Sequence, residues 1–153
     1  MSNPSPNKSS LLSQLLGMLQ ERLSDAQQTL LTTQASLGNE TKSTAGDKYE
    51  TGRAMVQIEL QKLAMQRDKV DQQIQILTKI DPQKPCEKVE FGAFVQTNKE
   101  RYFVAVGMGK VELQDGLVYV ISLDSPIGRA LQDRKAGERV HFQGRELHLV
   151  TID

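Results

Sequence analysis

The chain has 153 residues, of which 38% are hydrophobic, so it can form one domain or two small ones but not the core of a large enzyme. Its 19 Lys and Arg residues balance its 19 Asp and Glu residues. Neither the part before Ile80 nor the part after it has the basic excess of a protein that holds nucleic acid by its phosphates. Any nucleic acid in its function is therefore expected to be reached through a protein partner.

Residues 1–10, MSNPSPNKSS, are predicted to be a flexible polar tail. They lack the positive start and apolar run of a signal peptide, and no window of the sequence has the apolar length needed to span a bilayer. The single cysteine, Cys86, excludes an internal disulfide and fits a reducing compartment; it is interpreted as an inert thiol in a linker. The sequence thus predicts a soluble, cytoplasmic protein without a membrane partner.

Residues 11–80 are predicted to form an antiparallel coiled-coil hairpin, because apolar positions recur at alternating steps of four and three. The first stripe comprises Leu12, Leu16, Leu19, Leu23, Ala26, Leu30, Thr33 and Leu37. The second comprises Tyr49, Arg53, Val56, Leu60, Leu63, Arg67, Val70, Ile74 and Leu77. Helices joined by about ten residues most simply fold back on each other. The tip is placed near residues 38–50, with Gly38 as the C-cap of the first helix. Dimerisation through the two stripes is the alternative.

Residues 81–88, DPQKPCEK, are predicted to be a linker, and residues 89–153 a small α+β domain with one helix packed on a mostly antiparallel sheet. Strands are expected within residues 88–97, 101–108 and 116–123, followed by a final pair, 138–142 and 146–152, that turns at Gly144. The helix is expected from Ser125 as N-cap, with Pro126 at its first position and Gly137 beyond its end.

Two carboxylates three positions apart, Asp47 and Glu50, are the candidate functional pair. On spacing alone they fit a capping box at the start of a helix. As exposed oxygen ligands they could also help to hold Mg²⁺, which keeps some of its waters and shares its coordination with phosphate. Two carboxylates would bind the ion weakly by themselves. They would matter where another protein already supplies ligands, a phosphate and a first metal ion.

Sites typical of enzymes are missing from the rest of the sequence. The run GMGK near Met108 lacks the remainder of a phosphate-binding loop, and Ser125 has no evident base partner. His141 and His148 flank the expected final hairpin without a third ligand at a zinc-like spacing. The chain is therefore not expected to be an enzyme in its own right.

Two runs near the C-terminal end resemble a known family. FGAFV at residues 91–95, and above all SPIGRAL at 125–131 followed by KAGERV, are similar to the C-terminal domain of the bacterial Gre transcript cleavage factors. That family has an FKBP-like C-terminal domain preceded by an antiparallel coiled-coil hairpin, a layout similar to this chain over nearly its whole length. At the hairpin tip the family has glycine, aspartate, two variable residues, glutamate and usually asparagine. Here these positions hold Gly46, Asp47, Glu50 and, in place of asparagine, Thr51.

The resemblance implies a function carried out on RNA polymerase. Gre factors bind with the globular domain at the rim of the secondary channel and insert the hairpin, so that the tip acids help to hold the second Mg²⁺ and a water. The polymerase then hydrolyses the backtracked transcript, a two-metal reaction. The resemblance thus implies that Asp47 and Glu50 assist this metal site only when docked, that no Mg²⁺ binds tightly to the free chain, and that nascent RNA is contacted indirectly by a monomer.

For the C-terminal domain, the resemblance implies polymerase contacts at Ser125, Pro126, Gly128 and Arg129. Gly128 and Arg129 are expected to face outward. The apolar residues of the same run are at least as well suited to the core; they are Ile127, Ala130 and Leu131.

The chain also departs from the family pattern. A tyrosine and an arginine commonly follow the acidic pair in Gre factors, and the corresponding positions here hold Ala54 and Ile58. A regulator that occupies the channel without stimulating cleavage is therefore the main alternative. A prolyl isomerase is disfavoured because the chain has no Trp and only seven Phe and Tyr residues for an aromatic pocket. A structural adaptor that dimerises through its stripes is the remaining alternative.

Overall fold

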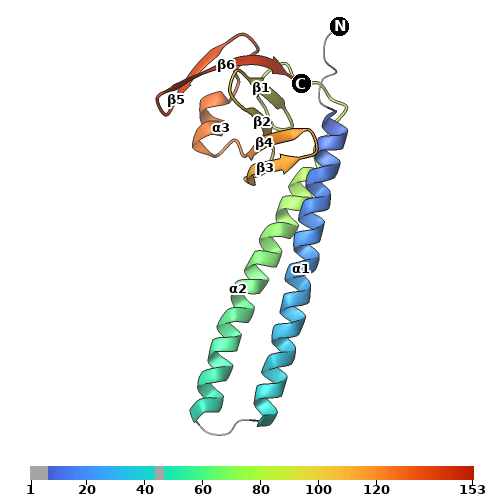
Figure 1. Ribbon diagram of the computed structural model, residues 1–153, viewed down its shortest axis with the longest axis vertical. Coiled ribbons are helices and arrows are strands. Elements are labelled where there is room, and N and C mark those ends of the chain that lie inside the picture. The colour runs from blue at the N-terminus through green and yellow to red at the C-terminus, as the bar shows by residue number, and fades with distance from the viewer. Residues whose placement is uncertain (1–6, 44–46) are drawn as a thin grey trace. The chain divides into compact units, whose positions relative to one another are not determined.

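The structure, a computed structural model, describes residues 7–43 and 47–153, and the side chains of residues 37–51 lie outside that description. The chain forms two compact units. The helical unit consists of residues 16–75, and the sheet unit combines the described residues before 16 with residues 76–153. Figure 1 shows the two long helices and the strands of these units. Among the described residues, none of the helices is long and apolar enough to cross a membrane.

The first helix, α1 (Lys8–Ser43), is longer than predicted at both ends. Residues 8–10, predicted as part of the tail, are helical. The predicted C-cap at Gly38 is wrong, because α1 continues through this glycine to Ser43. A single glycine costs a helix interior only about 1 kcal/mol relative to alanine, so it does not by itself end a helix. The second helix, α2 (Asp47–Thr78), begins three residues before the end of the predicted tip segment.

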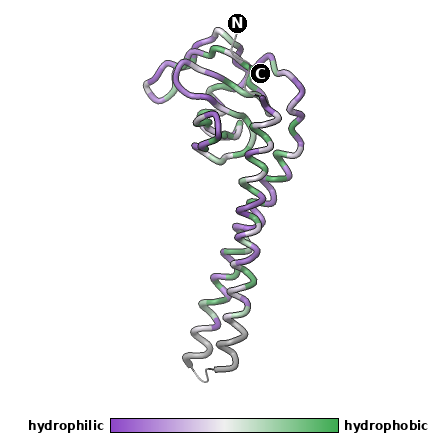
Figure 2. The backbone as a smooth tube through the Cα atoms, turned by 45° about the vertical axis from the view of Figure 1, so that its right-hand side comes forward, coloured by the Kyte–Doolittle hydropathy of each residue, from purple (hydrophilic) through white to green (hydrophobic). Residues whose placement is uncertain are grey.

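Most described members of the predicted apolar stripes are partly or fully buried in the helical unit. Between residues 20 and 36 of α1, the residues that are not exposed are Leu23, Ala26, Leu30 and Thr33, all members of the first stripe. On α2 the second stripe is buried or half-buried from Val56 onward, whereas its member Arg53 is exposed. The two helical segments run side by side in opposite directions (Figures 1 and 2), as predicted for a hairpin.

The sheet unit is an α+β domain with six strands and one short helix. In chain order these are β1 (Phe94–Thr97), β2 (Arg101–Val104), β3 (Gly109–Leu113), β4 (Gly116–Ile121), α3 (Pro126–Leu131), β5 (Arg139–Phe142) and β6 (Arg145–Ile152). The order across the sheet is β3-β4-β2-β1-β6-β5. All neighbouring pairs are antiparallel except β2 and β4, which are parallel. This agrees with the predicted mostly antiparallel sheet.

Strand β3 was not predicted, although its sequence alternates as a half-buried strand does. Val111 and Leu113 are buried, and Lys110 and Glu112 between and before them are exposed. The strand pairs with β4 from the register Gly109↔Val120 to Leu113↔Gly116. The turn signal in the sequence, QDG, therefore closes the hairpin between β3 and β4, whereas it was read as a boundary before a single strand.

The strand predicted over residues 88–97 is confirmed only in its second half. Gly92 has a φ of +90°, which interrupts the extended backbone before β1. Ahead of it, Lys88 forms an isolated bridge with Lys135, and the Val89 N–H donates to the carbonyl of Arg134 at 2.8 Å. The end of the predicted linker thus pairs with the segment that follows α3, and it does not extend the main sheet.

Helix α3 stops at Leu131, well before the predicted end near Gly137. The chain leaves the helix at Gln132, and Asp133 adopts a left-handed φ of 65°. The Asp133 N–H then donates to the carbonyl of Val89 at 3.0 Å. Pairing with the segment around Val89 therefore ends the helix. Gly137 has a φ of +92° and precedes β5.

The core of the sheet unit lies between one face of the sheet and α3. Its fully buried side chains include Val95 from β1, Leu131 from α3 and Leu147 and Leu149 from β6. Cys86, expected to be an inert thiol in a linker, is 6% exposed and belongs to this core. The linker is therefore partly built into the domain.

Candidate functional site

The acidic pair lies in the first turn of α2. This helix begins at Asp47, so Asp47 and Glu50 are its first and fourth residues. Residues three apart in a helix are neighbours on its surface. The N-terminal end of a helix also favours negative charge through its free N–H groups and dipole. The side chains of both residues lie outside the described part of the chain, so their capping and metal-binding roles remain predictions.

Two described side chains that follow this pair on α2, those of Ala54 and Ile58, offer no hydrogen-bond donor, whereas that of Arg53, three residues after Glu50, does. Ala54 is four residues after Glu50, about one helical turn, and it is exposed. Ile58 is 11 residues after Asp47, about three turns, and it is 54% exposed. Both positions therefore face solvent with aliphatic side chains, where Gre factors commonly carry tyrosine and arginine.

No group of three or more His, Cys, Asp or Glu residues that could hold a metal ion occurs among the described residues. His141 on β5 and His148 on β6 belong to the two paired strands of the final hairpin, two residues apart in register. The described structure thus contains no protein-only metal site.

The run at residues 125–131 has a clear local structure. Ser125 is the N-cap of α3, as predicted: its Oγ accepts a hydrogen bond from the Gly128 N–H at 3.1 Å and donates one to the carbonyl of Ser122 at 2.7 Å. Pro126 occupies the first helical position, where a missing N–H costs nothing. Leu131 is fully buried, as the core interpretation of this run expected.

Gly128 is buried, so the prediction that it faces outward is wrong. A Cβ at this position would lie 2.0 Å from the carbonyl oxygen of Ser122. Glycine is therefore required for the close approach of α3 to the preceding loop. Arg129 and Pro126 are exposed, as a contact role would need. The sequence alone could not tell whether Gly128 is buried or exposed, because glycine occurs both where packing is tight and in exposed turns.

Sequence reasoning also missed a buried lysine. Lys8 is 7% exposed, and its ammonium donates to the carbonyl oxygens of Lys84 at 2.9 Å and Gly92 at 3.2 Å. Its Nζ lies 4.0 Å from the Cys86 Sγ. Burial raises the pKa of the Cys86 thiol, and the nearby Lys8 charge only partly opposes this. These bonds attach the first turn of α1 to the segment that precedes β1.

A charged cluster joins the β1–β2 turn to β6. Arg145 Nη1 donates to Glu100 Oε1 at 2.7 Å, and the Tyr102 hydroxyl donates to Glu100 Oε2 at 2.9 Å. The Arg145 hydrogen bond lowers the pKa of Glu100. Burial, and then the bond to Glu100, raise the pKa of the Tyr102 hydroxyl. The cluster stabilises the sheet and holds no pair of groups poised for proton transfer near neutral pH.

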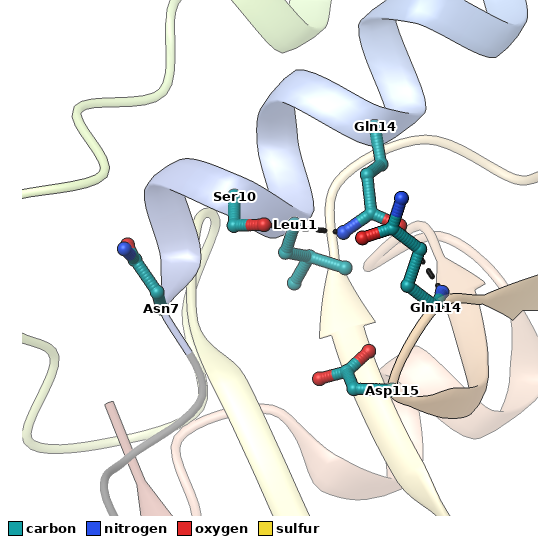
Figure 3. Close-up of a pocket in the computed structure, with 6 residues that line it drawn as sticks. All are labelled: Asn7, Ser10, Leu11, Gln14, Gln114 and Asp115. Carbon is teal, nitrogen blue, oxygen red and sulfur yellow. Dashed lines mark hydrogen bonds between the residues drawn. The ribbon is translucent and has the colours of Figure 1, made fainter.

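A small cavity of about 180 Å³ lies within the sheet unit (Figure 3). It is lined by Asn7, Ser10, Leu11, Gln14, Gln114 and Asp115. The Gln114 N–H donates to the side-chain oxygen of Gln14 at 3.2 Å, and the amide nitrogen of Gln14 donates to the Ser10 hydroxyl at 3.2 Å. These bonds attach the start of α1 to the β3–β4 turn. The Ser10 hydroxyl is bonded to the Gln14 amide, and Asp115 is paired with Arg101 at 3.4 Å, so the lining presents no acid–base pair.

Comparison with known proteins gives a resemblance to solved structures. Neither a family model nor a curated protein sequence matches the chain. A solved structure described as that of the transcription factor Gfh1 aligns with it at a TM-score of 0.32 and 21% sequence identity. The alignment covers 97% of this chain and 94% of that one.

Proposed function

We propose that this chain is a Gre-like transcription factor that binds RNA polymerase through the secondary channel and stimulates cleavage of backtracked transcripts. The proposal includes the fold of that family, a coiled-coil hairpin followed by an FKBP-like domain. It also includes a cytoplasmic location and a monomeric state. The chain would not be an enzyme itself, because the hydrolysis belongs to the polymerase.

The observation that carries the proposal is the combination of two motifs with their places in the chain. The run at residues 125–131, which resembles the Gre C-terminal domain, forms the capped helix α3. The acidic pair begins α2, directly after the connection between the two long helices. Asp47 and Glu50 thus follow the connection at one end of the helical unit, whose α1 segment from residue 16 to 43 extends on the order of 40 Å. This is the place where a channel-entering factor needs them.

The chemistry proposed for the pair is the positioning of a metal ion and a water. Bound Mg²⁺ in the polymerase site would polarise the phosphate and activate the attacking water. The carboxylates of Asp47 and Glu50 would complete the coordination of that ion, which the free chain does not hold tightly. The exposed side chains of Pro126 and Arg129 would contribute to polymerase docking.

The test is transcript cleavage in purified stalled complexes with RNA polymerase from the same organism. The Asp47→Ala, Glu50→Ala double variant should lower the stimulated cleavage rate by about a hundredfold, because a lost metal contact removes several kcal/mol of transition-state stabilisation. The matched control is Glu21→Ala with Asp25→Ala, two exposed acids on α1. If the wild-type chain shortens no transcript, or the tip variant retains full stimulation, the cleavage role is wrong.

One observation favours a second candidate, a channel-binding regulator without cleavage activity. Ala54 and Ile58 are exposed next to the acidic pair and cannot hydrogen-bond to a transcript. If this alternative holds, the wild-type chain binds the polymerase and alters initiation or pausing without shortening RNA. The variant Ala54→Tyr with Ile58→Arg should then gain cleavage activity. If this variant also fails to stimulate cleavage, the lack of activity is not caused by Ala54 and Ile58.

A further inference from the structure

The side of α2 that faces away from its buried stripe carries exposed apolar residues. Met55 is 66% exposed, Ile58 54% and Met65 72%. With Lys62 and Lys69 they recur at steps of three and four residues, so they form one continuous strip along the helix. These five residues are called the outer face of α2. Ile58 lies midway in sequence between the half-buried stripe residues Val56 and Leu60, which places it on the opposite side.

The outer face of α1 provides the comparison within the same helical unit. Its equivalent positions hold the half-buried Met18, which corresponds to Met55, and the exposed residues Glu21, Asp25, Gln28 and Thr32. This is an ordinary solvated helix surface, with polar and acidic side chains opposite the buried stripe. A solvent-facing side of a helix in this unit therefore does not need apolar side chains such as the methionines and isoleucine of α2. Single exposed apolar residues are common, but a strip of them with intervening lysines indicates an interaction surface.

We propose that the outer face of α2 binds a protein surface that presents apolar side chains flanked by carboxylates. Within the proposed function, on which this inference rests, that surface is part of the wall of the polymerase channel. Lys62 and Lys69 have no salt-bridge partner among the described residues. The neighbouring acid, Asp68, is paired with Arg67 at 3.1 Å. The outer face is therefore apolar with a net positive charge, and an acidic, partly apolar surface complements it.

The geometry of the helix connects this face to the acidic pair. Met65 is 18 residues after Asp47, which corresponds to five full turns of 3.6 residues. Ile58 is 11 residues after Asp47, or about three turns. Asp47 and the outer face consequently lie along the same side of α2. A protein that bound this face would fix the rotation of α2 about its axis, and with it the direction in which the backbone presents the acidic pair.

Other occupants fit the outer face less well. A nucleic acid would require a longer series of basic residues than two lysines, and it would gain little from methionine and isoleucine in the centre. A second copy of α2 in a symmetric pair would bring lysines close to lysines, and like charges oppose such a pairing. A partly apolar, acidic protein surface can pack against the methionine and isoleucine side chains and also pair with the two lysines.

The experiment measures the affinity of the full chain for purified core RNA polymerase of the same organism. The first variant is Met55→Gln, Ile58→Gln, Met65→Gln, which removes the apolar side chains but keeps residues that favour a helix. It should weaken binding about tenfold or more, as expected when several central contacts are lost. The second variant, Lys62→Glu with Lys69→Glu, should weaken binding more strongly at low salt than at high salt. The matched control on α1, Glu21→Ala, Gln28→Ala, Thr32→Ala, should change affinity less than about twofold.

Circular dichroism and solution mass must show that each variant remains folded and that the wild-type chain is monomeric. If the wild-type chain binds the polymerase and the glutamine variant binds equally well, the inference is wrong and the proposed function stands. If the wild-type chain does not bind, both fail. Loss of binding in the lysine variant alone would show that the contact is purely electrostatic and would overturn the assignment of a partly apolar partner surface. A wild-type dimer that the glutamine variant converts to monomer would identify a second copy as the occupant and also overturn it.

Discussion

The helical unit and the sheet unit bury their apolar residues to different extents. In the described part of the helical unit the buried apolar side chains are Leu19, Leu30 and Leu63, and the remaining stripe positions are only half-buried or exposed. The sheet unit buries most of the apolar side chains of its strands, many of them completely. A pair of helices can cover only one side of each helix, whereas a sheet covered by a helix and loops encloses a core. At most positions of the helical unit, packing therefore does not restrict which side chain can be present.

The two units also use glycine differently. Gly17 in α1 has no atom within 4 Å of the Cβ it lacks, so packing does not require it. Gly128 in α3 lies against the carbonyl of Ser122 and tolerates no side chain. The residue type at position 128 is therefore set by its neighbours in the fold, whereas the outer residues of the helical unit can vary without a packing cost. The comparison predicts where substitutions should affect stability and where they should affect only activity.

The largest effect on stability is expected from Gly128→Ala. The added Cβ would approach the Ser122 carbonyl oxygen to 2.0 Å, and the backbone on both sides would have to move. We expect a loss of about 4 kcal/mol or more in the free energy of unfolding of the sheet unit. Urea unfolding followed by the signal of Tyr102 and Tyr119 measures it. Gly107→Ala is the control, since nothing lies within 4 Å of its added Cβ. Equal stability of the two variants would contradict the packing role.

A smaller difference is expected between equivalent leucine truncations in the two units. Leu147 in β6 is fully buried, and Leu63 in α2 is 8% exposed. Leu147→Ala should cost about 3 kcal/mol, because an enclosed core cannot close the cavity. Leu63→Ala should cost about 2 kcal/mol or less, since a pair of helices can relax around the missing side chain. Urea unfolding, read by circular dichroism for the helices and by tyrosine for the sheet unit, separates them. A greater loss of unfolding free energy in Leu63→Ala than in Leu147→Ala would contradict the expected difference between the two units.

The smallest effect is expected from the charged cluster of the sheet unit. The pKa of Glu100 is lowered by the hydrogen bond from Arg145, so its ionised form is the one stabilised by folding. Its contribution is present at neutral pH and is lost as the pH falls through the lowered pKa of the folded state. Glu100→Gln should therefore reduce stability at neutral pH and match the wild-type chain at low pH. Thermal unfolding across this range measures it, with Glu112→Gln, an exposed acid on β3, as the control. A constant difference at all pH values would exclude the charge as its source.

Much of the helical unit was predictable from the sequence, because its periodicity is a local property. The stripe through Leu19 and Leu30 is buried as the steps of three and four indicated. Helix ends were less predictable: Gly38 was taken as a cap, and α1 passes through it. The interaction of Lys8 with the carbonyls of residues 84 and 92 was not predictable, because nothing near Lys8 in sequence indicates a partner 76 residues away.

For the candidate site, the sequence alone located Asp47 and Glu50 and the run at residues 125–131. Local patterns also determined the cap of α3 and the order of helices and strands, because capping, turn chemistry and alternation act over a few residues. The tertiary structure decided which residues of that run are exposed and can contact a partner. Gly128 became buried and Arg129 remained exposed, because only the folded loop brings the Ser122 carbonyl against α3. It likewise decided which side of α2 remains uncovered, because burial of one stripe by a second helix leaves Met55, Ile58 and Met65 in solvent.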